Sequence, residues 1–150
     1  MRKAWMMVLT VCIGWAGPVT LAGAGLFSAK GAVIAILDGD LFVGEAEGHL
    51  NGAGTLVIQS QKTPDLKCLG QFTSSAELGG KGQLTCSDGA TATFQFRRLS
   101  VFRGHGTGSH SRGAMSFTYG ITAEEAVLYL KLPEGKKLTR NGTELALNDL

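Results

Sequence analysis

Apolar and polar residues alternate along much of the middle of the chain. In 93–96 and in 115–119 every second residue is large and apolar, as in Thr93-Phe94-Gln95-Phe96. A period of two is the pattern of a β-strand that buries one face. Nearer the start, two apolar runs at 32–37 and 41–43 flank Asp38-Gly39-Asp40, which predicts a hairpin with a tight Asp-Gly turn. Further strands are expected at 54–60, 67–73, 82–87, 90–98, 100–107 and 113–119.

The pattern changes after Gly120. Thr122 is followed three residues later by Glu125, a capping box that predicts one short helix near 123–130. Asn141-Gly142 then lies between two short strand-like runs and predicts a C-terminal hairpin. Short strands with frequent turns predict a mainly all-β fold, an antiparallel meander of hairpins that forms a rolled sheet, a sandwich or a small barrel.

Three segments share a frame of glycines, in which a strand and a loop lead to Gly-x-Gly and a returning strand. The copies span 42–58, 68–86 and 90–110. Read as hairpins, they place Phe42 opposite Ile58, Cys68 opposite Cys86 with a loop at 73–81, and Ala90 opposite His110. The frame, over roughly 41–120, resembles the MORN repeat, in which an aromatic strand precedes a Gly-x-Gly and a return strand. The resemblance implies a meander of hairpins.

The cysteines of the second copy are predicted to form a disulfide. Directly opposed residues in an antiparallel ladder have Cβ atoms roughly 4.5–5.5 Å apart, close to what a disulfide needs. The even pair Cys68 and Cys86, which remains if an export signal is removed, also favours a bridge. Two buried free thiols or a metal pair are the alternatives.

The N-terminus has the form of an export signal. Arg2 and Lys3 precede an apolar run at 4–16, and Leu21-Ala-Gly-Ala24 fits the cleavage rule, with Gly31 as a second option. This predicts a signal peptide at 1–24 and a single periplasmic or secreted β-rich domain at 25–150, in which 121–150 is a helix and hairpin extension. Alternatively, residues 4–27 anchor the chain in the inner membrane, the only membrane contact expected, or Cys12 carries a lipid.

Charge limits the range of partners. The formal net charge of +2 comes from Arg2 and Lys3, so the remaining chain is neutral, which argues against nucleic-acid binding. Residues 25–88 carry four basic and seven acidic side chains, and residues 89–150 carry eight and five. The two halves either complement each other or leave a basic patch for an anionic polymer. The binding residues predicted for that patch are Arg97, Arg98, Arg103, His105, His110 and Arg112.

Catalytic chemistry has little support in the residues. His105 and His110 lie in a Gly/Ser-rich stretch that is expected to be a solvated loop, and the alternative is a small metal-dependent hydrolase that uses both. Asp38, Asp40 and the pair Glu45 and Glu47 are interpreted as an exposed strand face. The serines lack a Gly-x-Ser-x-Gly elbow.

The sequence therefore predicts a non-enzymatic exported envelope protein with no cofactor. It is expected to be a binding or scaffold module for an unknown protein or anionic envelope polymer, with a metal-dependent hydrolase and a membrane-anchored structural protein as alternatives.

The disulfide can be tested by mass spectrometry of the exported chain. Oxidation outside the cytosol should make the chain lighter by two hydrogens than its reduced form. Alkylation of Cys68 and Cys86 without prior reduction would contradict the bridge.

Overall fold

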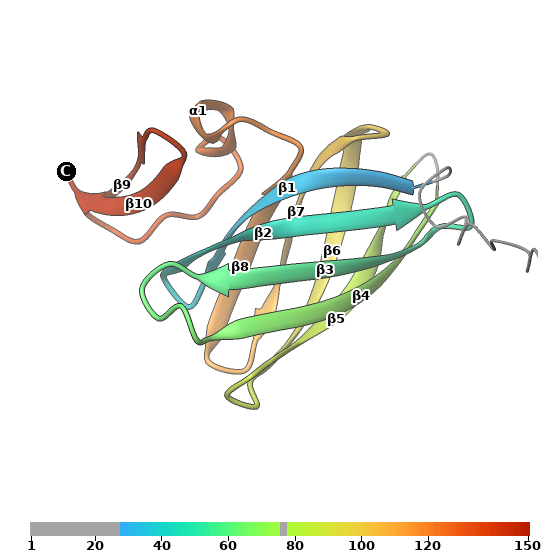
Figure 1. Ribbon diagram of the computed structural model, residues 1–150, viewed down its shortest axis with the longest axis horizontal. Coiled ribbons are helices and arrows are strands. Elements are labelled where there is room, and N and C mark those ends of the chain that lie inside the picture. The colour runs from blue at the N-terminus through green and yellow to red at the C-terminus, as the bar shows by residue number, and fades with distance from the viewer. Residues whose placement is uncertain (1–27, 76–77) are drawn as a thin grey trace, which may run out of the picture.

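The computed structural model describes residues 28–75 and 78–150, which form an eight-stranded antiparallel barrel and a C-terminal extension (Figure 1). Each strand pairs with the next, and the last pairs with the first. The strands are β1 Ser28–Leu37, β2 Asp40–His49, β3 Ala53–Ser60, β4 Lys67–Ser75, β5 Gly79–Cys86, β6 Thr91–Ser100, β7 Arg103–His110 and β8 Gly113–Tyr119. The all-β meander is confirmed, as a small barrel. The signal, anchor and lipidation predictions at 1–24, 4–27 and Cys12 lie outside the described residues.

The predicted registers hold for one hairpin and are wrong for two. Cys68 faces Cys86 and is bonded to it, as expected. The predicted loop at 73–81 is wrong, because β4 and β5 continue to Ser75 and Gly79. Phe42 faces Ser60, and His110 faces Ala92 in place of Ala90, so both registers differ from prediction by two residues. A shift of two leaves every side chain on its predicted face, and alternation alone could not detect it.

The Gly/Ser-rich stretch with His105 and His110, predicted to be a solvated loop, is strand β7. β6 runs to Ser100 and β7 begins at Arg103, so the turn lies at Val101 and Phe102. The predicted strand at 100–107 therefore lies three residues too early. The glycines of β7 are paired with residues of β6 and β8. Glycine and serine are also common in loops, so the composition of this strand alone predicted a loop.

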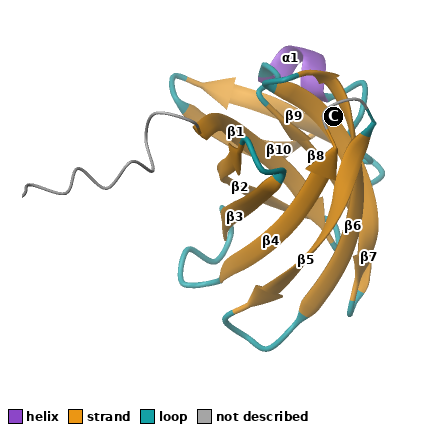
Figure 2. Cartoon of the chain, turned by 90° about the vertical axis from the view of Figure 1, so that its right-hand side faces the viewer, coloured by secondary structure: helices purple, strands orange, loops and turns teal. Residues whose placement is uncertain are grey.

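The C-terminal extension consists of a short helix and a hairpin. In α1, Ala123–Ala126, the Thr122 hydroxyl caps the helix by accepting from the Glu125 N–H. The hairpin β9 Lys136–Asn141 and β10 Glu144–Asp149 forms a separate two-stranded sheet outside the barrel (Figure 2). Both the short helix and the Asn-Gly hairpin are confirmed, although α1 ends earlier than the predicted 123–130.

The extension explains the continuous apolar run in β1. Val33 and Leu37 face the barrel interior, whereas Ile34 and Ile36 face outward, and all four are buried. The outward pair packs against residues of the extension, which are Ile121, Ala123, Ala126 and Leu130, with Leu138, Leu145 and Leu147 at the edge. Residues 33–37 of β1 are thus buried on both faces of the sheet, so both faces can carry apolar side chains and no alternation is seen.

Aromatic rings and glycines interlock inside the barrel. A Cβ atom added to Gly54 would lie 2.1 Å from Cζ of Phe72 on the neighbouring strand. At Gly106 it would lie 2.5 Å from Cζ of Phe117. Five glycines of the frame are therefore positions where a nearby ring lies against the backbone, a known device for packing aromatics on β-sheets; they are Gly54, Gly80, Gly82, Gly104 and Gly106.

Gly54 and Gly48 provide a matched test of this packing, because they face each other across β2 and β3 beside the same ring. Gly54→Ala should lower the free energy of unfolding by about 2–3 kcal/mol through overpacking. Gly48→Ala should change it by less than about 1 kcal/mol, because its added Cβ lies 3.8 Å from Phe72. Denaturant unfolding measures both, and equal effects would contradict the interlock.

Candidate functional site

The barrel is filled at one end and hollow at the other. At the filled end, Leu37, Ile58, Leu84 and Met115 are fully buried beside the disulfide. We call the opposite end the mouth; β1 begins there, and the β2–β3, β4–β5 and β6–β7 turns surround it. A cavity of about 520 Å³ opens at the mouth. This volume is within the roughly 300–1,000 Å³ of small-molecule sites.

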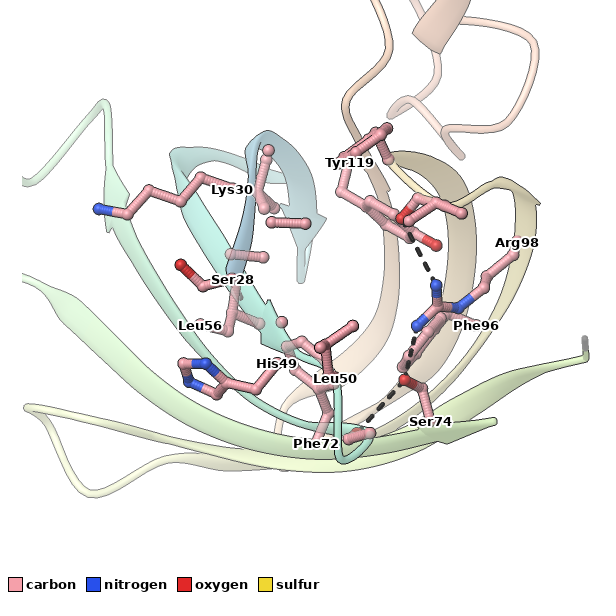
Figure 3. A pocket seen from close by; sticks show the side chains of 18 of the residues that line it. Ser28, Lys30, His49, Leu50, Leu56, Phe72, Ser74, Phe96, Arg98 and Tyr119 are labelled. Atoms are coloured by element: carbon pink, nitrogen blue, oxygen red, sulfur yellow. Dashed lines mark hydrogen bonds between the residues drawn. The ribbon is translucent and has the colours of Figure 1, made fainter. Parts of the chain in front are cut away.

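The wall of the cavity is mainly apolar and aromatic (Figure 3). Phe96 packs edge to face against both Phe72 and Tyr119, with ring centroids 5.5 and 5.8 Å apart. Phe94 and Phe117 pack in the same way at 5.3 Å. The rings form a rigid apolar surface of the kind that accepts hydrocarbon.

Arg98 is the charged group that points into this apolar cavity (Figure 3). It follows Ala92, Phe94 and Phe96 on the inward face of β6. Its Nη2 donates to the Ser74 hydroxyl at 2.7 Å, and Nη1 donates to the Val101 carbonyl at 3.5 Å. Its Nε is buried and has no hydrogen-bond partner among the described residues.

Acidic groups are missing from the described part of the cavity wall. No Asp or Glu is among the described residues that line it, and none of them forms an ion pair with Arg98. Burial raises the pKa of the Tyr119 phenol above its ordinary value of 10.0, and the nearby Arg98 guanidinium opposes that rise less strongly. Tyr119 therefore stays protonated at neutral pH and can donate a hydrogen bond.

Glu45 and Glu47 of β2 lie on the outer wall, as predicted for an exposed strand face. Lys30 Nζ lies 3.2 Å from a Glu45 oxygen and 3.9 Å from a Glu47 oxygen. The hydrogen bond and charge of Glu45, with the charge of Glu47, raise the pKa of Lys30. Lys30 is among the residues that line the edge of the cavity, but its side chain points away from the cavity in Figure 3, toward the two glutamates that offset its charge.

The six predicted binding residues do not form one surface. Arg98 points inward, whereas its neighbour Arg97 is exposed on the outer wall. Arg103 is paired with Glu125 of α1. Arg112 is paired with Asp88 at the filled end.

The two histidines are also separated. His105 stacks on Tyr129 of the extension at 4.3 Å, whereas His110 belongs to the inward set of β7. Residues five apart on a strand face opposite sides, so the pair predicted for a metal-dependent hydrolase does not converge. The described residues hold no cluster of three or more His, Cys, Asp or Glu side chains placed to bind a metal. They also hold no helix with the length and hydropathy to cross a membrane.

Sequence reasoning missed Ser74, Tyr119 and the phenylalanine wall as site residues. A signal for Arg98 was present, because the inward series in 90–98 places Arg98 two residues beyond Phe96. Ser74 and Tyr119 had no such signal, because their place at the mouth depends on pairing between strands.

Comparisons of this chain with family models, with curated proteins and with solved structures find no match. The resemblance of the glycine frame to the MORN repeat stays a prediction, and the geometry of the cavity is the basis on which a function can be assigned.

Proposed function

We propose that this chain is a non-enzymatic, exported binding protein that holds a small amphipathic carboxylate in its barrel cavity. The observation that supports this most is the Arg98 guanidinium, which lies in an apolar cavity without an acidic partner among the described residues. Apolar walls favour hydrocarbon, and guanidinium is the side chain best suited to a carboxylate. Together they favour a molecule with both parts.

Nε of Arg98 is a buried donor that has no hydrogen-bond partner among the described residues. Ser74 occupies Nη2, and its own hydroxyl donates to the Gly52 carbonyl at 3.3 Å, so the guanidinium is held in place from β4. Arg98 is only partly buried, but a cation that faces an apolar cavity is still less well solvated than one in water, so pairing it with an anion is favourable. A carboxylate in the cavity would accept from Arg98, and the protonated Tyr119 is a second donor near it.

Export is part of the same proposal. The Cys68–Cys86 bridge is compatible with an oxidising compartment outside the cytosol. The alternative contact surface at 97–112 for a protein or an anionic envelope polymer has less support, because its residues face different directions and two of its arginines are already paired.

Calorimetric titration with decanoate and with decanol tests the cavity and the cation separately. Both should bind, because both have a long apolar chain. Decanol should bind at least about tenfold more weakly, because a hydrogen bond to a charged group contributes roughly 1.5–3 kcal/mol. No binding of either molecule would overturn the proposed function.

Two neighbouring arginines supply the matched variants. Arg98→Leu should abolish the preference for decanoate and leave decanol binding unchanged or stronger. Arg97→Leu removes the same charge from the outer wall and should leave both affinities unchanged. If Arg98→Leu binds decanoate as tightly as the unchanged chain does, the cavity takes apolar molecules but Arg98 does not hold the carboxylate.

A further inference from the structure

The turns at the mouth carry large apolar side chains that are exposed to solvent. Leu50 is 82% exposed on the β2–β3 turn and Leu78 is 80% exposed on the β4–β5 turn. Val101 and Phe102 on the β6–β7 turn are 62% and 61% exposed. We call these four side chains the rim.

The turns at the filled end have the opposite character. They contain the polar stretches 38–39, 61–65, 87–89 and 111–112, and none of their residues is among the exposed large hydrophobics. Surface turns are ordinarily polar, and clustered exposed apolar groups mark an interaction surface. Turns face solvent at both ends of the barrel. The apolar character of the turns at the mouth therefore needs an explanation that is specific to that end.

We infer that the rim docks the mouth onto a lipid bilayer. The four side chains lie on three separate turns around an opening and do not form one flat patch, an arrangement that suits shallow insertion of the tips between lipid headgroups. This inference goes beyond the cavity ligand and does not require that one be bound.

The cavity is continuous with the rim. Leu50, Val101 and Phe102 belong to the rim and also line the cavity. A hydrocarbon chain that leaves a bilayer under the mouth would therefore meet apolar side chains at every step into the barrel. This continuity favours a bilayer over a protein partner, which would close the opening.

The path of the backbone is consistent with this orientation. β1 begins at Ser28, which pairs with His49 at the mouth. The apolar run at 4–16 precedes Ser28 in the sequence. The segment that precedes Ser28 therefore joins the barrel at the mouth and not at the filled end.

Local tryptophan probes test the docking whether or not the N-terminal segment is retained. Phe102→Trp reports on the rim and Leu69→Trp on the barrel wall, where Leu69 is 62% exposed, as Phe102 is at 61%. Both go into a Trp5→Phe, Trp15→Phe background to remove the other tryptophans. With phosphatidylcholine vesicles, the rim probe should shift to the blue and be quenched by brominated lipid, and the wall probe should not.

A second pair of variants tests the energetics. Leu50→Ser with Val101→Ser should lower the partition onto vesicles at least about tenfold, from lost apolar burial, whereas Leu69→Ser should leave it unchanged. Binding should persist at high salt, because it does not depend on charge.

Three results would overturn the docking. The first is a rim probe whose emission does not change when vesicles are added, and the second is an equal response of the rim and wall probes. The third is a concentration-dependent emission shift of the rim probe without lipid, accompanied by a dimer in gel filtration. The last result would assign the mouth to a second copy of the chain.

Discussion

The contact between an aromatic ring and a glycine on the next strand is the interaction on which the barrel depends. Phe72 lies against Gly54, and Phe117 lies against Gly106, so that an added Cβ at either glycine would overlap the ring. A barrel of eight strands has an interior just wide enough for side chains to fill, and rings on every strand would overfill it. Alternating rings with bare backbone lets six aromatic side chains share that space without closing it. The glycines thus determine how much of the interior is solid and how much is cavity.

Apolar and polar side chains are also arranged in sequence along the barrel axis. On β6 the inward residues run from Ala92 through two phenylalanines to Arg98, and on β8 they run from Met115 through Phe117 to Tyr119. On β4 they run from Cys68 to Ser74. In these three strands the polar side chain lies at the end nearer the mouth. An amphipathic molecule in the cavity would therefore place its polar group near the mouth, where Arg98 and Tyr119 can reach it, with its apolar part against the rings.

Local patterns predicted much of this fold, and the limits of prediction have physical causes. The Asp-Gly and Asn-Gly turns and the facing cysteines involve residues close in sequence, so the sequence held enough information for them. The registers of β2 with β3 and of β6 with β7 differed by two residues, a change that leaves the hydrophobic faces intact. Closure of the barrel pairs β1 with β8, which are far apart in the sequence. Hydrophobic alternation and turn residues describe only neighbouring segments, so they do not predict this pairing. Ser74 and Tyr119 could not be assigned to a site for that reason, whereas the position of Arg98 followed from alternation.

Closure also explains why so many predicted binding residues have structural partners. The β1–β8 seam pairs five residues of each strand, Val33 to Leu37 with Met115 to Tyr119. The extension crosses this seam on the outside. The Lys131 N–H donates to the Ser116 hydroxyl at 2.9 Å, and the Gly120 N–H donates to the Ala32 carbonyl at 2.8 Å. The ion pair of Arg103 with Glu125 and the stack of His105 on Tyr129 attach the extension to β7. These two residues therefore stabilise the closed barrel from outside, which leaves the inward Arg98 as the basic residue of 97–112 that is available to a ligand in the cavity.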